Sequence, residues 1–236
     1  MRATDFEFRY RFFIIVGVFV LGFFAYRVDP INVAIWLGHI ASGDPLSGVV
    51  SPWAVRAFLI LGTGLVFAAA ALRTWASACL GADVVGDSVV RSEALVANGP
   101  FRYVRNPLYL GLILLAAGIG FAASRLGWLV LVAGTTLFLM RLTFREEAAL
   151  QEKQGNAYAQ FVTQVPRLFP SFTPRLPAGT TEPRWGQAFT GEMMMWGLVI
   201  SMGLLAATQS AKLFQQTVAL CFVAYAVVRV PGMFKK

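Results

Sequence analysis

Long apolar runs constrain the fold of this chain more than any other feature of its sequence. The hydrocarbon core of a bilayer is crossed by about 20 helical residues. It offers the backbone no hydrogen-bond partners, so a spanning segment must be a helix or a strand of a closed barrel. The apolar residues here do not alternate with polar ones as they do in barrel strands. Six runs suit a helical span, at residues 12–26, 57–80, 108–123, 126–142, 193–208 and 213–230.

The composition agrees with a membrane protein. Apolar residues make up 57% of the chain and charged residues 14%, with a mean hydropathy of +0.65, whereas about 25% of the residues of soluble domains are charged. We therefore predict an all-α fold: a polytopic membrane helix bundle of about six transmembrane helices that forms a single membrane domain over residues 1–236.

The basic residues predict how the bundle is oriented. Residues 28–55, between the first two runs, contain no Lys or Arg, which places this loop outside by the positive-inside rule. The N-terminus, the loops between runs two and three and between runs four and five, and the C-terminus are rich in Arg and Lys and are predicted to be cytoplasmic. We expect an integral protein of the bacterial inner (cytoplasmic) membrane. The first run also resembles a signal peptide, but Asp5 and Glu7 in its basic flank favour a retained span.

Several function classes are excluded by residue counts. The net charge of +8 is spread over several loops, with no basic run interleaved with aromatic residues. We interpret these basic residues as determinants of membrane topology that contact an anionic leaflet. No nucleic-acid partner is expected. A single histidine, His39, cannot build a zinc site or a triad beside the polar segments, so no metal is expected. Cys79 and Cys221 fall within apolar runs and are interpreted as packing residues.

Three features inside or between the runs carry further expectations. Arg73 lies in the second run, where we expect its side chain to snorkel toward the cytoplasmic interface rather than contact a substrate. The small residues at 116–120 predict close helix packing. The outer loop 28–55 is expected to include an amphipathic piece on the membrane surface.

Two polar segments flank the hairpin of runs three and four. The first is GPFRYVRNPLYLG, residues 99–111, in which Pro107 suits the first position of a helix and Asn106 suits its N-cap. The helix start would present free N–H groups to an anion beside Arg105. An interfacial anchor of Arg and Tyr is the alternative interpretation.

The second polar segment begins where the fourth run ends. Arg145, Glu146 and Glu147 continue the helix, and Gly155 is expected to end it. Adjacent helical residues point about 100° apart, so one acid should face the protein and the other water. Pairing with Arg145 or Arg105 is one explanation for these acids, and binding an ammonium group is the other.

Together the two segments resemble the isoprenylcysteine carboxyl methyltransferase and phospholipid methyltransferase superfamily of integral membrane enzymes. The shared pattern is R-N-P-x-Y-x-G at residues 105–111, a membrane hairpin, E-E-x-x-L at 146–150, G-x-x-Y at 155–158 and V-P-R at 165–167. The resemblance covers residues 98–170 with the same order and spacing.

The resemblance implies a methyltransferase that binds S-adenosylmethionine at the cytoplasmic face. It places cofactor binding on Arg105, Asn106, Pro107, Tyr109, Gly111, Glu146, Glu147, Tyr158, Pro166 and Arg167, and catalysis on Glu146, Glu147 and Arg105. A Glu would pair with the methionine ammonium, the helix start and Arg105 would receive its carboxylate, and a Tyr would pack on the adenine or the sulfonium. The chain then divides into N-terminal spans with an outer loop (1–92), a cofactor-binding core (93–175) and a C-terminal connector with a hairpin (176–236).

Two departures from the family pattern bear on the acceptor. Asn106 stands where prenylcysteine enzymes carry His, which makes prenylcysteine less expected, and Gln154 stands where the family has an aromatic residue. The predicted function is methyl transfer to a hydrophobic acceptor from the bilayer, a lipid or an isoprenoid, by carboxylate O- or amine N-methylation. A small-molecule transporter and a noncatalytic membrane scaffold are the alternatives. Lipid-facing and partner-facing Leu and Phe look alike, so the sequence leaves the oligomeric state open.

Overall fold

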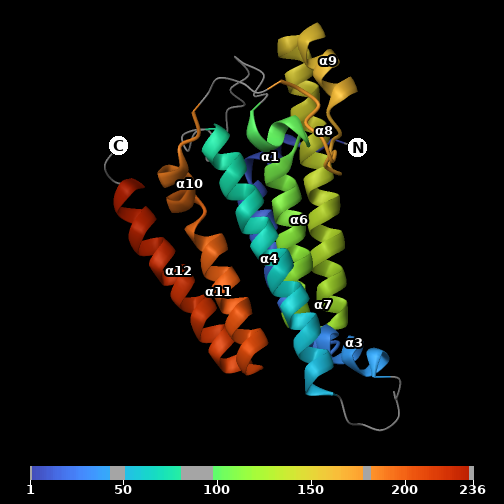
Figure 1. Cartoon of the computed structure of the whole chain (residues 1–236), viewed down its shortest axis with the longest axis vertical. Coiled ribbons are helices and arrows are strands. Elements are labelled where there is room, and N and C mark those ends of the chain that lie inside the picture. The colour runs from blue at the N-terminus through green and yellow to red at the C-terminus, as the bar shows by residue number, and fades with distance from the viewer. Residues whose placement is uncertain (1, 43–50, 81–97, 178–181, 234–236) are drawn as a thin grey trace.

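The protein is a bundle of helices that run mostly along one axis (Figure 1). The computed structural model describes residues 2–42, 51–80, 98–177 and 182–233. Over these residues it contains helices and no strand beyond one isolated bridge between Asn32 and Ser124. The predicted all-α fold is therefore confirmed.

The helical elements follow the predicted apolar runs closely. Their bounds are α1 Asp5–Arg9, α2 Arg11–Phe24, η1 Ala25–Arg27, α3 Val33–Ala41, α4 Pro52–Leu80, η2 Gly99–Arg102, α6 Pro107–Ile119, η3 Gly120–Ala122, α7 Arg125–Leu129, the π-helical turn η4 Val130–Gly134, α8 Thr135–Gln154, α9 Asn156–Gln164, α10 Trp185–Gly191, α11 Met193–Thr208 and α12 Ala211–Met233. Each of the six runs falls on a helix or on helices that continue one another.

Three helices are long and apolar enough to cross a bilayer within the described residues. They are α4, the continuous helix from Arg125 to Gln154, and α12. The pair α10 and α11, bent by 61°, would make a fourth. The apolar stretch of α6 and η3 is shorter, so the number six, like the cytoplasmic placement of the termini, stays a prediction.

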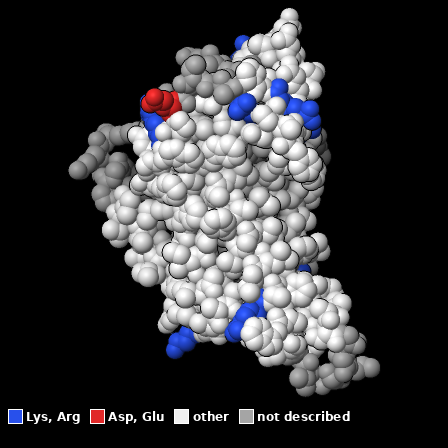
Figure 2. Space-filling view, viewed as in Figure 1, with Lys and Arg blue, Asp and Glu red and all other residues white. Residues whose placement is uncertain are grey.

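Charged side chains lie toward the two ends of the bundle. Figure 2 shows a broad uncharged band between them, as expected for a surface that faces lipid. The helix α1 and the end of α12 lie toward one end, and α3 lies at the other (Figure 1). The two predicted cytoplasmic segments and α1 thus share one end of the molecule.

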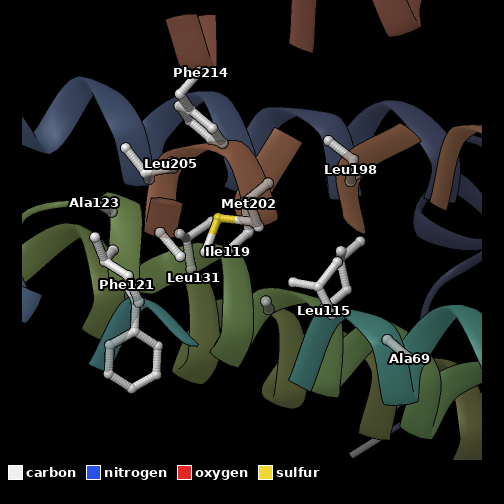
Figure 3. Packing of buried hydrophobic residues seen from close by; sticks show 14 of the residues in the cluster. Ala69, Leu115, Ile119, Phe121, Ala123, Leu131, Leu198, Met202, Leu205 and Phe214 are labelled. Atoms are coloured by element: carbon white, nitrogen blue, oxygen red, sulfur yellow. The ribbon is translucent and has the colours of Figure 1, made fainter. Parts of the chain in front are cut away.

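The core depends on a close approach of α4 and α6. A Cβ atom on Gly118 would lie 2.6 Å from the carbonyl oxygen of Gly62, so neither position has room for a larger residue while the helices stay in contact. Figure 3 shows Met202 of α11 beside Ile119 of α6, which joins the C-terminal hairpin to the same apolar core. The expectation of tight packing at residues 116–120 is confirmed.

The short helix α1 is fixed to α8 by its own polar residues. Thr4 and Glu7 cap each other's backbone N–H groups. Glu7 also accepts two hydrogen bonds from the Arg141 guanidinium, at 2.8 and 3.1 Å, and the backbone N–H of Ala3 donates to the carbonyl of Arg141. The hydrogen bonds from Arg141 lower the pKa of Glu7 from 4.5 to about 2.

Arg73 does not snorkel, contrary to the prediction. Its Nε and Nη2 donate to both carboxylate oxygens of Glu192, at 2.8 and 2.9 Å, and Ser77 Oγ donates to the same carboxylate at 2.9 Å. The exposed fractions of the Arg73 and Glu192 side chains are 14% and 4%. The pair is therefore a buried cross-link between α4 and the bend that separates α10 from α11.

Candidate active site

The two polar segments of the sequence meet at one end of the bundle. The backbone N–H of Arg105 donates to the carbonyl of Pro166 at 2.9 Å, and the side-chain amide of Asn106 donates to the carbonyl of Arg167 at 3.2 Å. Further along, the N–H of Ser171 donates to the carbonyl of Tyr103. The segment that precedes α6 and the segment that follows α9 are thus held side by side by their backbones.

These contacts change the role expected for Asn106. It occupies the N-cap position of α6, and Pro107 follows at the first helical position as predicted, but the Asn106 side chain makes no cap hydrogen bond. It donates to Arg167 instead. The N–H groups in the first turn of α6 consequently receive no side-chain cap from Asn106.

Glu147 is the centre of a buried ion cluster. Its Oε1 lies 2.8 Å from Nη1 of Arg105, and its Oε2 accepts from Nη2 of Arg167 at 2.8 Å. The side chains of Arg105 and Glu147 are 8% and 11% exposed. One carboxylate faces two guanidinium groups, so the cluster carries a net charge of +1.

Arg105 is incompletely paired despite its burial. Nη1 of Arg105 lies beside the Glu147 carboxylate, yet Nε of Arg105 has no hydrogen-bond acceptor among the described residues. Buried donors are rarely left in this state unless a water, an ion or a ligand completes them. An anionic group placed beside Arg105 would supply the missing acceptor.

Tyr158 covers the cluster from α9. It packs with Phe161 and Val165 in a small apolar core and is 4% exposed. Burial is the main cause that raises the pKa of Tyr158 to about 12, and the nearby Glu147 carboxylate adds to it. The phenol therefore stays neutral at physiological pH and can donate a hydrogen bond.

A cavity of about 360 Å³ lies beside Glu147, between α8 and α9. Gly155 makes this arrangement possible, because it connects the two helices with a φ of 53° that other residues adopt only at a cost. Among the predicted site residues, Glu147 and Tyr158 line the cavity. Its other lining residues are Arg2, Phe144, Ala148, Gln151 and Val162.

The second acid, Glu146, points to a different neighbour. The Tyr109 hydroxyl donates to Glu146 Oε1 at 2.6 Å, which joins α6 to α8. Tyr109 packs against a buried apolar cluster that includes Phe138 and Leu139 of α8. The prediction that the two acids face different ways holds, but Glu146 is bonded to the protein rather than exposed to water.

Pro107 and Gly111 stand apart from the cavity. Pro107 is buried at the start of α6. A Cβ atom on Gly111 would collide with the side chain of Arg73, so this glycine lets Arg73 pass along α6 to reach the carbonyl of Leu108, to which Arg73 Nη1 donates at 3.2 Å. The group that approaches the Gly111 backbone is a side chain of α4.

Sequence reasoning missed several residues that line the cavity. Arg2 was read only as a topology signal, and its place beside the cavity depends on the docking of α1 onto α8. Phe144 and Gln151 lie three residues before and four residues after Glu147, which is the spacing of one helix face. That periodicity could have identified them.

Comparison with known proteins finds one family that resembles part of this site. Residues 57–157 match the phospholipid methyltransferase family. The match contains Arg105, both acids and the intervening hairpin, and it ends one residue before Tyr158. No curated protein and no solved structure matches the chain. Through this matched region, the chain is similar to the phospholipid methyltransferase family, which is part of the isoprenylcysteine carboxyl methyltransferase and phospholipid methyltransferase superfamily of integral membrane methyltransferases.

Proposed function

We propose that the protein is a methyltransferase that uses S-adenosylmethionine to methylate a hydrophobic acceptor, a lipid or an isoprenoid, taken from the bilayer. The family supports methyl transfer to a membrane lipid-like substrate. The observation that carries the proposal is the buried cluster of Arg105, Glu147 and Arg167 beside the 360 Å³ cavity. Cavities of roughly 300–1,000 Å³ hold small molecules and cofactors in proteins.

The charges around the cavity suit the zwitterionic methionine part of this cofactor. The cluster is net positive, and Nε of Arg105 is buried without an acceptor among the described residues. A carboxylate beside Arg105 would supply this acceptor. Glu147 also lines the cavity, where its carboxylate oxygens can accept hydrogen bonds from an ammonium group.

The aromatic side chains suit the remainder of the cofactor. Phe144 and Tyr158 both line the cavity. Aromatic faces attract cations, and a sulfonium is a cation with apolar substituents. Arg167 already lies over Phe144, 4.7 Å from its ring centroid, which leaves Tyr158 as the residue we assign to the sulfonium or the adenine.

S-adenosylmethionine supplies an activated methyl group on a sulfonium that is already a good leaving group. Held by Arg105, Glu147 and Tyr158, it would supply this methyl group to the lone pair of the acceptor. No protein nucleophile is needed, so the residues act by positioning the reactants and excluding water.

The two acids are suited to different tasks. Glu147 is paired with two guanidinium groups, which suits a role in binding. Glu146 has a tyrosine hydroxyl as its hydrogen-bond partner. We propose that Glu146 is the general base that accepts the proton released by an amine acceptor. A carboxylate acceptor would release no proton and would need no base.

The position of Glu146 also fits an acceptor from the membrane. Tyr109, its partner, packs against the buried apolar cluster of Phe138, Leu139 and Leu142 in α8, so the pair lies where the apolar core meets the polar end of the bundle. We place this end on the cytoplasmic side of a bacterial inner membrane, because most Arg and Lys side chains outside the apolar runs gather there.

Calorimetry tests the cofactor site directly. S-adenosylmethionine is titrated into purified protein in lipid nanodiscs, comparing wild type with Arg105→Lys, Glu147→Gln and the control Arg175→Gln, whose side chain lies exposed on a nearby loop. We expect the first two variants to bind at least about tenfold more weakly, since each loses a charge-assisted contact, and the control to bind as wild type does. Equal affinity in all four proteins would remove this site.

Labelling identifies the acceptor. Protein, methyl-labelled S-adenosylmethionine and total membrane lipid are incubated together, and the labelled product is identified by mass spectrometry. Transfer of label to an organic-soluble lipid or isoprenoid supports the proposal. Label found only in water-soluble small molecules would contradict the membrane acceptor while leaving cofactor binding intact.

A further inference from the structure

A second and larger cavity lies at the opposite end of the bundle. It has a volume of about 750 Å³ and is formed between α4 and α11, with Arg56, Thr63, Gly64 and Phe67 on one side and Gly203 on the other. Arg56 belongs to the first turns of α4, near α3, and its Nη2 donates to the carbonyl of Ala207 close to the turn that joins α11 to α12. Neither end of this groove reaches the Glu147 cluster.

The groove is open because two of its lining residues are glycines. A Cβ atom on Gly64 would have no atom within 4 Å, and one on Gly203 would find only Thr63, at 3.9 Å. Bulky apolar residues form the rim, because Ile60 and Phe67 are 58% and 51% exposed. The groove is therefore an open, apolar channel on a helix that is long enough to cross the bilayer.

The length of the groove matches one leaflet. Arg56 and Phe67 are separated by eleven residues of α4, which corresponds to about 16 Å at 1.5 Å per residue. Half of the hydrocarbon core is about 15 Å. A lipid acyl chain that runs parallel to the helix from the membrane surface to the bilayer centre would fill this distance.

A single cation lies at the surface end of the groove. The guanidinium of Arg56 is 5.2 Å from the ring centroid of Trp53, an arrangement typical of the membrane interface. Its Nε is buried and has no hydrogen-bond acceptor among the described residues. Guanidinium groups bind phosphate oxygens through paired N–H donors, so a lipid phosphate at this level would supply what Nε lacks.

We propose that this groove binds an anionic phospholipid, with one acyl chain between α4 and α11 and the headgroup phosphate on Arg56. The charge at one end and the apolar channel of leaflet length together select such a lipid over a protein helix. The site lies at the other end of the membrane domain from the methyltransferase site. It would thus hold a resident lipid rather than the methyl acceptor.

Native mass spectrometry tests this site without depending on activity. Protein is extracted from vesicles that contain equal amounts of phosphatidylglycerol and phosphatidylcholine with the same chains, and the lipids that remain bound are counted. The variants are Arg56→Gln, which removes the charge, Gly64→Leu, which fills the open channel, and Lys212→Gln, which removes an exposed charge at the same end of the bundle. Far-UV circular dichroism confirms that each variant is folded.

We expect wild type and Lys212→Gln to retain phosphatidylglycerol in preference to phosphatidylcholine. Arg56→Gln should lower phosphatidylglycerol retention by about tenfold, as for the loss of one charge-assisted contact, and Gly64→Leu should lower retention of both lipids. Equal retention by Arg56→Gln and wild type, or an equal loss in Lys212→Gln, would overturn the proposal. So would a Gly64→Leu variant that changes the oligomeric mass rather than the lipid count, because the occupant would then be a second copy of the chain.

Discussion

Replacing Glu192 with Ala tests how much the buried cross-link between α4 and the C-terminal hairpin contributes to stability. The Glu192 carboxylate accepts two hydrogen bonds from Arg73 and one from Ser77. Its removal leaves the Arg73 charge inside the bundle without a counter-ion. Removing one partner of a buried pair costs about 3–5 kcal/mol. For a chain of this size, that loss lowers the melting temperature by roughly 6–20 °C.

The reasoning also predicts what a double variant does. Arg73→Met with Glu192→Leu removes both charges and replaces them with apolar side chains, so the cost should fall to within about 1 kcal/mol of wild type. The exposed pair of Arg145 and Asp5, with side chains 30% and 97% exposed, is the matched control. Arg145→Met should cost less than about 1 kcal/mol.

Guanidinium unfolding in detergent, followed by tryptophan fluorescence, measures all four proteins under one condition. The argument fails if Glu192→Ala is as stable as Arg145→Met, because the buried charge would then carry no penalty. It also fails if the double variant is less stable than Glu192→Ala alone. That result would mean that the pair stabilises the bundle by attraction rather than only by avoiding an isolated charge.

Three further predictions concern other parts of the bundle. Gly118→Ala should destabilise the protein by about 1–3 kcal/mol, since its Cβ would meet a backbone oxygen of α4; the same unfolding assay measures it. Tyr109→Phe should leave the affinity for S-adenosylmethionine unchanged in calorimetry while lowering the turnover of labelled acceptor, because it removes only the hydrogen bond to Glu146. The pKa of Glu7 is lowered to about 2, so its contribution to stability is complete above about pH 4.5 and is lost as the pH falls toward 2. Melting temperatures of wild type and Glu7→Gln should therefore differ at pH 6 and converge at low pH.

The helices could be predicted from the sequence because lipid exposure leaves a strong local signal. Runs such as 57–80 and 193–208 are mostly apolar and are flanked by polar residues, and α4 and α11 follow them closely. The bend before α11 was not predicted. The bend occurs at Glu192. In the sequence this residue is one acid in a polar connector, and nothing in its pattern indicates a bend.

The partner of Arg73 could not be predicted for a related reason. Arg73 and Glu192 are 119 residues apart, and no periodicity or motif connects them. An isolated Arg near the end of a span is usually explained by snorkelling, which requires no partner. Only the packing of α10 against α4 shows that a carboxylate lies within reach.

The candidate site was predictable in its membership but only partly in its contacts. The pattern around Arg105 and Glu147 indicated two segments that act together, and the structure brings these residues within 2.8 Å. The sequence did not indicate that Asn106 would bond to Arg167 instead of capping α6. A cap depends on local spacing alone, whereas this contact requires the chain after α9 to return to the start of α6.

The paired acids at the end of α8 are tolerated because each has its own partner. Adjacent positions on a helix differ by about 100°, which turns Glu147 toward Arg105 and Arg167 and turns Glu146 toward Tyr109. Two carboxylates on one helix face would repel each other. An acid without a hydrogen-bond or ion-pair partner at the end of a membrane span would be destabilising. The doublet instead yields one ion-paired carboxylate beside the cavity and one carboxylate that is hydrogen-bonded to Tyr109, which packs on the apolar core. Under the proposed function, this difference lets Glu147 bind the cofactor while Glu146 accepts the proton of an amine acceptor.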